Sequence, residues 1–267
     1  MSKLSKTIIA AAALAAVALL VDFAVQDQLT PVELADSDQT PVKTAENQPA
    51  ETGSSRVKNF TAREFKNLVN GLSLPNTTPL AAPPAITGNP EADKLIAELA
   101  EARGYELRSV PSSQLSTHMG IELQPLLIPD WEELAAAAQQ AGHELKIRSG
   151  YRSVDDQRDL FLARLSSSGI THQQIAAGTV DQALNDIMAL TAPPGYSRHH
   201  HGYTIDVYEP ATAVFEYSDS YAWLKADNFA NAKKYGFVPS YPEGAGQQGP
   251  EPEAWEFVWA NKDFVLE

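Results

Sequence analysis

The chain of 267 residues contains no cysteine, and this absence constrains both its fold and its chemistry. No disulfide can staple it, so the folded state must rest on a core, for which 43% hydrophobic residues suffice. Any transition metal must be held by histidine, aspartate or glutamate, because thiolate sites are excluded. The net charge of −14 provides no basic surface, so nucleic acid is not an expected partner.

The N-terminus predicts export. Lys3 and Lys6 precede an apolar run from Ile8 to Val21, which has the length and flanks of a secretory signal. The run is short for a membrane span, which needs roughly 20 apolar residues. We therefore interpret residues 1–25 as a signal peptide or an N-terminal membrane anchor. The expected location is periplasmic or otherwise extracytoplasmic, with anchoring to the inner membrane as the open alternative.

Residues 26–88 are expected to form a disordered, proline-rich linker. The first part lacks aromatic residues and is dominated by polar side chains, so it cannot bury enough apolar surface to offset its ordering entropy. One short helix is predicted within it, over residues 60–74, where Thr61 and Glu64 form a capping box.

The compact domain is predicted to span residues 89–267. Its helices come first and its strands are scattered among long connections, which indicates an α+β fold. Helices are expected from Asn89 to Gly104, from Asp130 (with Glu133 completing a capping box) to near Gly142, after the Ser153 cap, over 181–190 and over 221–235. Strands are expected in "HELKIRSG", "YTIDVY" and "WEFVWA".

The stretch "GYSRHHHGYTIDVY" is the strongest candidate for a metal site. In an extended segment, His199 and His201 would share one face and His200 would take the other. A bend at Gly202 would then let a nearby histidine and Asp206 converge on one ion. Imidazole with carboxylate is ordinary zinc chemistry.

Three motifs resemble the VanY-type zinc D-alanyl-D-alanine carboxypeptidases, a group that includes D,D-dipeptidases and peptidoglycan endopeptidases. "SRHHHGYTID" resembles the signature S-x-H-x-x-G-x-A-x-D, with Thr204 in place of its alanine. "SGYRSVDDQRDLF" and "WLKADNFANAKKYGF" are similar to S-G-Y-R-S-x-x-x-Q-x-x-L-F and, more loosely spaced, W-L-x-x-N-A-x-x-Y-G-F. The matched signature positions are Ser197, His199, Gly202 and Asp206. The resemblance runs from about Asn89 to Trp259.

This resemblance implies a small antiparallel sheet flanked by helices, one Zn²⁺ ion, and peptidoglycan stem peptides as substrate. The family ends in E-P-W-H, with glutamate as general base and histidine as the last zinc ligand; this chain has Glu253-Ala254-Trp255-Glu256. The implied base is therefore Glu253, and the implied metal ligands are His199, Asp206 and Glu256. With two carboxylates the site is harder than the family's, so Mn²⁺ or Co²⁺ are alternative ions.

The replacement of histidine by Glu256 leaves three hypotheses open. Glu256 ligates the metal through oxygen, or His200 or His201 takes its place, or the metal is lost and the protein only binds cell-wall peptides. The first predicts a D,D-carboxypeptidase or an endopeptidase of the same fold, and the third predicts a non-catalytic binding protein. Metal content and cleavage of a pentapeptide stem would separate them.

The substrate's terminal carboxylate is expected to bind Arg152, because a guanidinium offers a planar fork of donors. Gln157, Ser197 and Ser153 complete the predicted substrate-binding set. "SGYRS" matches neither the G-x-S-x-G nor the S-x-x-K signature of serine hydrolases, and we find no phosphate-cradling loop. The oligomeric state is not indicated.

Overall fold

The computed structural model describes residues 57–266. The expected signal or anchor at 1–25, and the linker as far as residue 56, lie outside the described residues. Within 57–266, no helix has the length and apolarity needed to cross a membrane.

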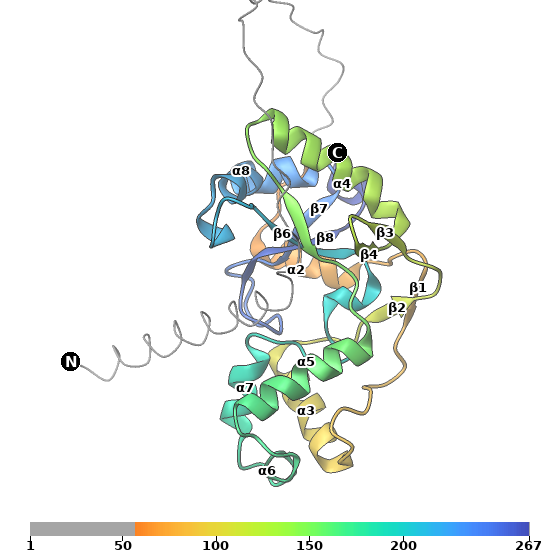
Figure 1. Ribbon diagram of the computed structural model, residues 1–267, viewed down its shortest axis with the longest axis vertical. Helices are drawn as coiled ribbons and strands as arrows, with labels where there is room; N and C mark the ends of the chain where they lie inside the picture. The colour runs from red at the N-terminus through yellow and green to blue at the C-terminus, as the bar shows by residue number, and fades with distance from the viewer. Residues whose placement is uncertain (1–56, 267) are drawn as a thin grey trace, which may run out of the picture. The chain divides into compact units, whose positions relative to one another are not determined.

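The described chain alternates short strands with helices of very different lengths (Figure 1). The α-helices are α2 (Ala62–Gly71), α3 (Pro90–Arg103), α4 (Ile128–Gln140), α5 (Val154–Ser167), α6 (His172–Ala176), α7 (Asp181–Met188), α8 (Asp219–Lys233) and α9 (Lys262–Val265). The 3-10 helices are η1 (Pro125–Leu127), η2 (Arg198–His201) and η3 (Phe215–Tyr217). The strands are β1 (Thr77–Pro79), β2 (Ser109–Pro111), β3 (Ser116–His118), β4 (Ile121–Leu123), β5 (Lys146–Ser149), β6 (Thr204–Tyr208), β7 (Phe237–Tyr241) and β8 (Glu253–Trp259).

Four strands form the sheet that organises the molecule, in the order β5-β6-β8-β7 with antiparallel neighbours throughout. The pairs β1-β2 and β3-β4 are separate two-stranded ribbons. The predicted α+β class, a small antiparallel sheet flanked by helices, is confirmed. Sequence reasoning missed β7 because Pro239 lies inside it; the strand tolerates proline because it is at the edge of the sheet.

The apolar side chains gather in two clusters. One joins the sheet to α2, α4 and α8, and the other joins α3, α5, α6 and α7, which lie together in Figure 1. The segment from α7 to β6 passes from the second cluster to the first. This segment contains the histidine stretch, so the candidate site lies where the two clusters meet.

Helix α3 begins and ends as predicted. Asn89 accepts the N–H groups of Glu91 and Ala92, and Gly104 closes the helix with a left-handed φ of 91°. The prediction for α4 was wrong at its start, because the helix begins two residues before Asp130. Instead of capping, the Asp130 carboxylate accepts a 2.7 Å hydrogen bond from the indole of Trp259.

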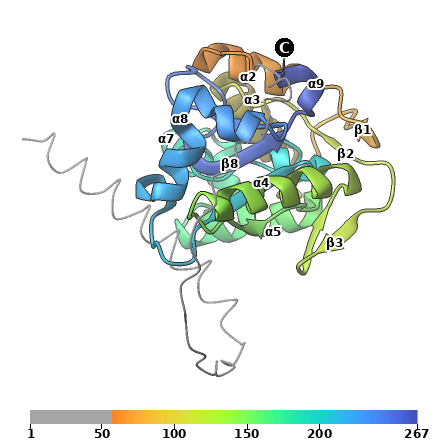
Figure 2. The same cartoon turned by 90° about the horizontal axis from the view of Figure 1, so that it is seen from above.

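The folded unit starts earlier than the expected residue 89. The capping box of Thr61 and Glu64 forms as predicted, and α2 places Phe65 and Val69 in the core beside the sheet. Figure 2 shows α2 beside α9 at the other end of the chain, and the Lys58 N–H donates to the carbonyl of Val265. The side chains of Phe65 and Val69 give this segment enough apolar surface to fold onto the domain.

Candidate metal centre

The three histidines form a 3-10 turn and not an extended segment, so the alternation of faces considered for them does not apply. The Ser197 hydroxyl accepts the N–H of His199 at 3.3 Å and starts the turn. Gly202 ends it with a left-handed φ of 76°, which a glycine adopts at little cost. The bend at Gly202 is confirmed, and it leads into β6, where Asp206 lies two residues before the end of the strand at Tyr208.

Two carboxylates face each other across neighbouring strands. Asp206 of β6 pairs in register with Glu256 of β8, and on its other side Asp206 pairs with Ser149 of β5. Directly opposed residues point to the same face of a sheet. The sheet therefore presents Ser149, Asp206 and Glu256 as one polar row.

His199 completes a cluster with these two acids. Its Nε2 lies 3.4 Å from Asp206 Oδ1 and 3.3 Å from Glu256 Oε2, and the three ligand atoms are all within 4.8 Å of one another. Its Nδ1 lies 2.6 Å from the carbonyl oxygen of Gly150. With its proton on Nδ1, the ring would direct the Nε2 lone pair into the cluster, as metal-binding histidines do.

The cluster fits a divalent cation in its donor chemistry. Asp206 Oδ1 is buried and has no hydrogen-bond partner among the described residues, which is costly unless another group satisfies it. One imidazole and two carboxylates form an acceptable donor set for zinc. His199, Asp206 and Glu256 could therefore hold such an ion, in agreement with the first of the three hypotheses.

The electrostatics also favour positive charge at this point. Burial alone would lower the pKa of His199, but Asp206 and Glu256 outweigh it and raise the pKa to about 10. Burial likewise disfavours ionised Glu256, yet its bonds to His199 and Ser240 and the charge of Arg198 lower its pKa. A site that stabilises a proton so strongly can exchange it for a metal cation.

His200 and His201 do not join the cluster. The Gly195 N–H donates to His200 Nε2 at 3.0 Å, so His200 Nδ1 carries the proton and donates to the Arg152 carbonyl at 2.8 Å. Burial lowers the pKa of His200 to about 4. Nδ1 of His201 accepts the Tyr203 N–H, and burial lowers its pKa well below the ordinary value. Both rings are thus neutral and structural, which argues against the second hypothesis.

Glu253 lies at the start of β8, on the same strand as Glu256, and is half-buried. Burial and the negative charges of Glu256 and Asp206 raise the pKa of Glu253 well above its ordinary value. A cation held by the cluster would favour the ionised form of Glu253, which is the form that a general base needs.

Arg152 lies next to the histidine turn, where its backbone N–H donates to the carbonyl of His199 at 3.3 Å. Its guanidinium donates to Gln157 Oε1 at 2.9 Å and to Ser149 Oγ at 3.3 Å. Gln157 is buried, and its amide donates to the carbonyl of Ala192 at 2.7 Å. The fork of Arg152 is therefore held in place by neutral partners.

The two predicted serines both cap helices. Ser153 Oγ accepts the Asp156 N–H at 3.0 Å and donates to its carboxylate at 2.6 Å, which starts α5. Ser197 caps η2 and is buried. Both hydroxyls already form hydrogen bonds within the protein, so a direct contact with substrate remains a prediction for both.

Sequence reasoning missed two residues behind the cluster. The Ser240 hydroxyl donates to Glu256 Oε1, and the Arg198 guanidinium donates in turn to Ser240 Oγ at 3.0 Å. Arg198 lies between the signature positions Ser197 and His199. This adjacency was the only sign in the sequence that Arg198 belongs to the site.

Comparison with known proteins gives one family and a group of distant structures. The model of the family "VanY: D-alanyl-D-alanine carboxypeptidase" matches residues 120–262. No curated protein is significantly similar in sequence. The chain is similar to a mutant of the vancomycin-resistance D,D-pentapeptidase VanY from a VanB-type resistance cassette, in complex with Zn(II), with 21% identity and a TM-score of 0.45; the match covers 58% of this chain and 84% of that one. It is also similar to the LD-carboxypeptidase LdcB, with 22% identity, a TM-score of 0.43, and 58% and 68% coverage.

Proposed function

Because the chain belongs to the VanY family of D-alanyl-D-alanine carboxypeptidases, we propose that it is a metal-dependent D,D-carboxypeptidase that removes the C-terminal D-alanine from peptidoglycan stem peptides. Family membership supports a peptidoglycan peptidase in general. The observation that carries the finer proposal is the convergence of His199, Asp206 and Glu256 on one point, with Glu253 on the same strand.

In this proposal His199, Asp206 and Glu256 hold one zinc ion. When bound, zinc supplies a Lewis acid that acidifies a water molecule and polarises the scissile carbonyl. Mn²⁺ and Co²⁺ are plausible substitutes, because two carboxylates make the donor set harder than one with two imidazoles. The strand pairing of Asp206 and Glu256 holds two of the three ligands in a fixed geometry.

Glu253 is the proposed general base. It takes a proton from the attacking water and transfers it to the nitrogen of the departing D-alanine. The surroundings that raise its pKa also suit the second half of this task, since they help the carboxyl to keep the proton until the leaving amine takes it.

Arg152 is the proposed anchor for the terminal carboxylate of the substrate. Among residues 57–266, its guanidinium donates to two neutral oxygen atoms, those of Gln157 and Ser149. An incoming carboxylate would give stronger, charge-assisted bonds than either of these partners. Ser153 and Ser197 shape the same corner through the helices they cap. An anchor of this kind fixes the distance from the chain end to the cleaved bond and so favours release of a single residue.

The expected export of the protein is consistent with this substrate, which lies outside the cytoplasm. We propose that residues 1–25 direct the protein to the periplasmic or extracytoplasmic space, as a cleaved signal or as an anchor. N-terminal sequencing of the protein from cell fractions would decide between the two.

The test is product analysis with three synthetic substrates. Purified full-length protein, stripped with a chelator and reloaded with one equivalent of zinc, is given a pentapeptide stem ending in D-Ala-D-Ala, a tetrapeptide stem ending in a single D-Ala, and a crosslinked stem dimer. We expect release of one D-alanine from the pentapeptide, loss of this activity in the stripped protein, and its return with zinc.

Preferred cleavage of the dimer would instead identify an endopeptidase. Preferred cleavage of the tetrapeptide would identify an L,D-carboxypeptidase. No cleavage by zinc-loaded protein, together with measurable binding of the pentapeptide, would contradict the proposal and leave a peptide-binding protein.

A further inference from the structure

The cluster of acids poses an electrostatic problem that the metal alone does not solve. Asp206, Glu253 and Glu256 bring three carboxylates together around one imidazole, so a divalent cation leaves one negative charge over when all three are ionised. Uncompensated charge is expensive in a buried site. Glu256 is the most buried of the three, with 5% of its surface exposed.

A buried arginine lies directly behind Glu256. The Ser240 hydroxyl donates to Glu256 Oε1 and accepts from the Arg198 guanidinium at 3.0 Å. The same guanidinium nitrogen donates to the backbone oxygen of Ser240, and the guanidinium stacks on the ring of Tyr241 at 4.0 Å. Ser240 therefore transmits the polarisation of a cation to one oxygen of Glu256 and leaves the other, Oε2, facing His199.

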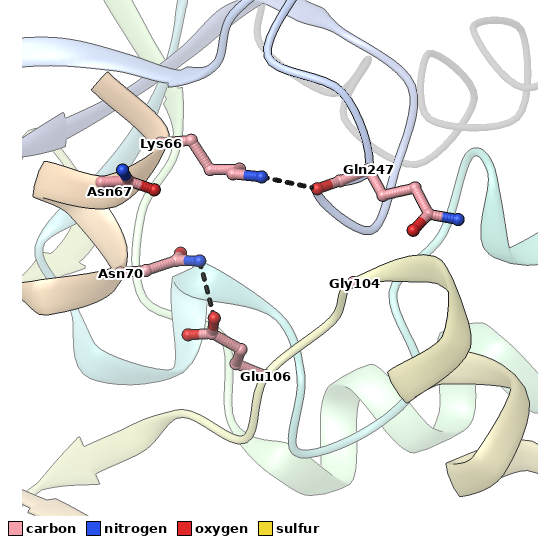
Figure 3. Close-up of a pocket in the computed structure, with 6 residues that line it drawn as sticks. All are labelled: Lys66, Asn67, Asn70, Gly104, Glu106 and Gln247. Atoms are coloured by element: carbon pink, nitrogen blue, oxygen red, sulfur yellow. Dashed lines mark hydrogen bonds between the residues drawn. The ribbon is translucent and has the colours of Figure 1, made fainter. Parts of the chain in front are cut away.

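The far side of the guanidinium is fixed by Asn70 of α2. Asn70 Oδ1 accepts from Arg198 at 2.8 Å, and Asn70 Nδ2 donates to Glu106 at 2.8 Å in the wall of a surface pocket (Figure 3). The pocket also contains Lys66, whose ammonium group donates to the Gln247 carbonyl. The helix α2 thus holds the arginine from the side opposite to the cluster.

Arg198 has no carboxylate of its own. Within residues 57–266, no acidic oxygen lies within ion-pair distance of its guanidinium, although only 1% of the residue is exposed. Nε of Arg198 also lacks a hydrogen-bond partner there. A charge buried at such cost needs a counter-charge. Two of its direct partners lead to a carboxylate: Asn70 leads to Glu106, which is exposed, and Ser240 leads to Glu256, which is buried. Glu256 is therefore the counter-charge that shares the buried surroundings of Arg198.

We propose that Arg198 is a positioning residue that acts through Ser240 to hold Glu256 as the third metal ligand, with Oε2 directed at the metal position. The Arg198–Ser240 pair lets a carboxylate act as a metal ligand at this position, because the pair fixes the rotamer of Glu256 and offsets part of the negative charge of Glu256. This inference rests on the proposed function, since it assumes that the cluster binds a metal ion.

The experiment measures the zinc affinity of chelator-stripped full-length protein by competition with a chromophoric chelator. We expect Ser240→Ala and Arg198→Met each to weaken zinc binding by about 10- to 100-fold, the usual cost of losing a residue that orients a ligand. Ser240→Thr keeps the hydroxyl and should restore most of the affinity.

Arg108→Met is the matched control. Arg108 is also a buried arginine and also donates to Asn70, at 3.4 Å, but it makes no contact with Ser240 or Glu256. It should disturb the same region without a comparable loss of zinc affinity. The Co²⁺-substituted proteins give a second readout, because the visible absorption of Co²⁺ reports its coordination and should change in Ser240→Ala but not in Arg108→Met.

Coupling to Glu256 decides the matter. In a Glu256→Gln background, Ser240→Ala should cost little further zinc affinity, since the group that it positions is gone. Equal losses in both backgrounds, or unchanged affinity in Ser240→Ala, would overturn the inference while leaving the proposed metal site intact. Absence of zinc binding by the unmodified protein would overturn the proposed function itself. If Arg198→Met does not fold, Ser240→Ala carries the same test with a smaller change.

Discussion

The two sides of the candidate site are built on opposite principles. On the sheet side, His199 faces two carboxylates, and Asp206 Oδ1 has no hydrogen-bond partner among the described residues. At the strand-to-helix corner, the donors of Arg152 are engaged by Gln157 and Ser149, which are neutral. One side thus gathers negative groups around a single ring nitrogen, and the other holds its positive group with neutral partners.

This difference teaches how each side would meet its ligand. Strand pairing fixes the two carboxylates, so the metal position is formed before a metal binds. The unsatisfied carboxylate oxygen of Asp206 favours binding of a cation there. The corner keeps its arginine in position by temporary neutral bonds, which a substrate carboxylate can replace with stronger ones. The predictions below alter one side at a time, from the largest expected effect to the smallest.

Glu253→Gln should have the largest effect, because it removes the proton acceptor and leaves the shape of the side chain. We expect turnover of the pentapeptide to fall by about 10²- to 10⁴-fold, the usual contribution of a general base. Zinc content, measured by elemental analysis, should stay near one ion per chain. Activity close to that of the unmodified protein would show that the base has been misassigned.

Arg152→Met should affect the substrate and not the metal. Loss of charge-assisted hydrogen bonds of about 1.5–3 kcal/mol should lower kcat/KM by about 10- to 100-fold. Steady-state kinetics on the pentapeptide would show the loss, and zinc titration should show unchanged affinity. A large loss of zinc affinity would mean that the two sides are not separable in the way described.

The pH dependence of zinc binding tests the sheet side alone. Since the pKa of His199 is raised to about 10, the metal-free protein carries a proton there at neutral pH, and zinc must displace it. Affinity should therefore rise with pH, by about tenfold for each unit between pH 6 and 8 for one displaced proton. Calorimetry in buffers of different ionisation enthalpy counts the released protons, and a count of zero would refute the assigned protonation of His199.

Ser153→Ala should have the smallest effect on catalysis. Its hydroxyl caps α5, so its loss should lower the free energy of unfolding by about 1 kcal/mol. Chemical denaturation would show this. The change in KM should be far smaller than that of Arg152→Met. A rise in KM as large as that of Arg152→Met would show that Ser153 contacts the substrate directly.

The sequence predicted more of the site than of its support. The motif spacing led to His199 and Asp206, and the residues on β8 followed from the third motif. The signature position distinguished His199 from His200 and His201, but the bonds of the two other rings to backbone groups depend on tertiary contacts that no motif shows. The role of Ser240 was missed because it depends on β7, a strand that was not predicted because it contains Pro239.

The fold shows the same division. Local signals such as the Asn89 cap and the Thr61 capping box gave correct helix starts, since they depend on atoms a few residues apart. The start of α4 was wrong because Asp130 bonds instead to Trp259, a residue distant in the sequence. The predicted linker extended too far because the packing partners of Phe65 lie in the sheet, and composition alone cannot show such contacts.

The most direct test of the central claim is an anomalous difference map at the zinc edge from crystals grown with zinc. The account predicts one peak about 2.0–2.2 Å from His199 Nε2 and from one carboxylate oxygen each of Asp206 and Glu256. A cluster without a peak, or a peak bound by His200 or His201 in place of Glu256, would contradict it.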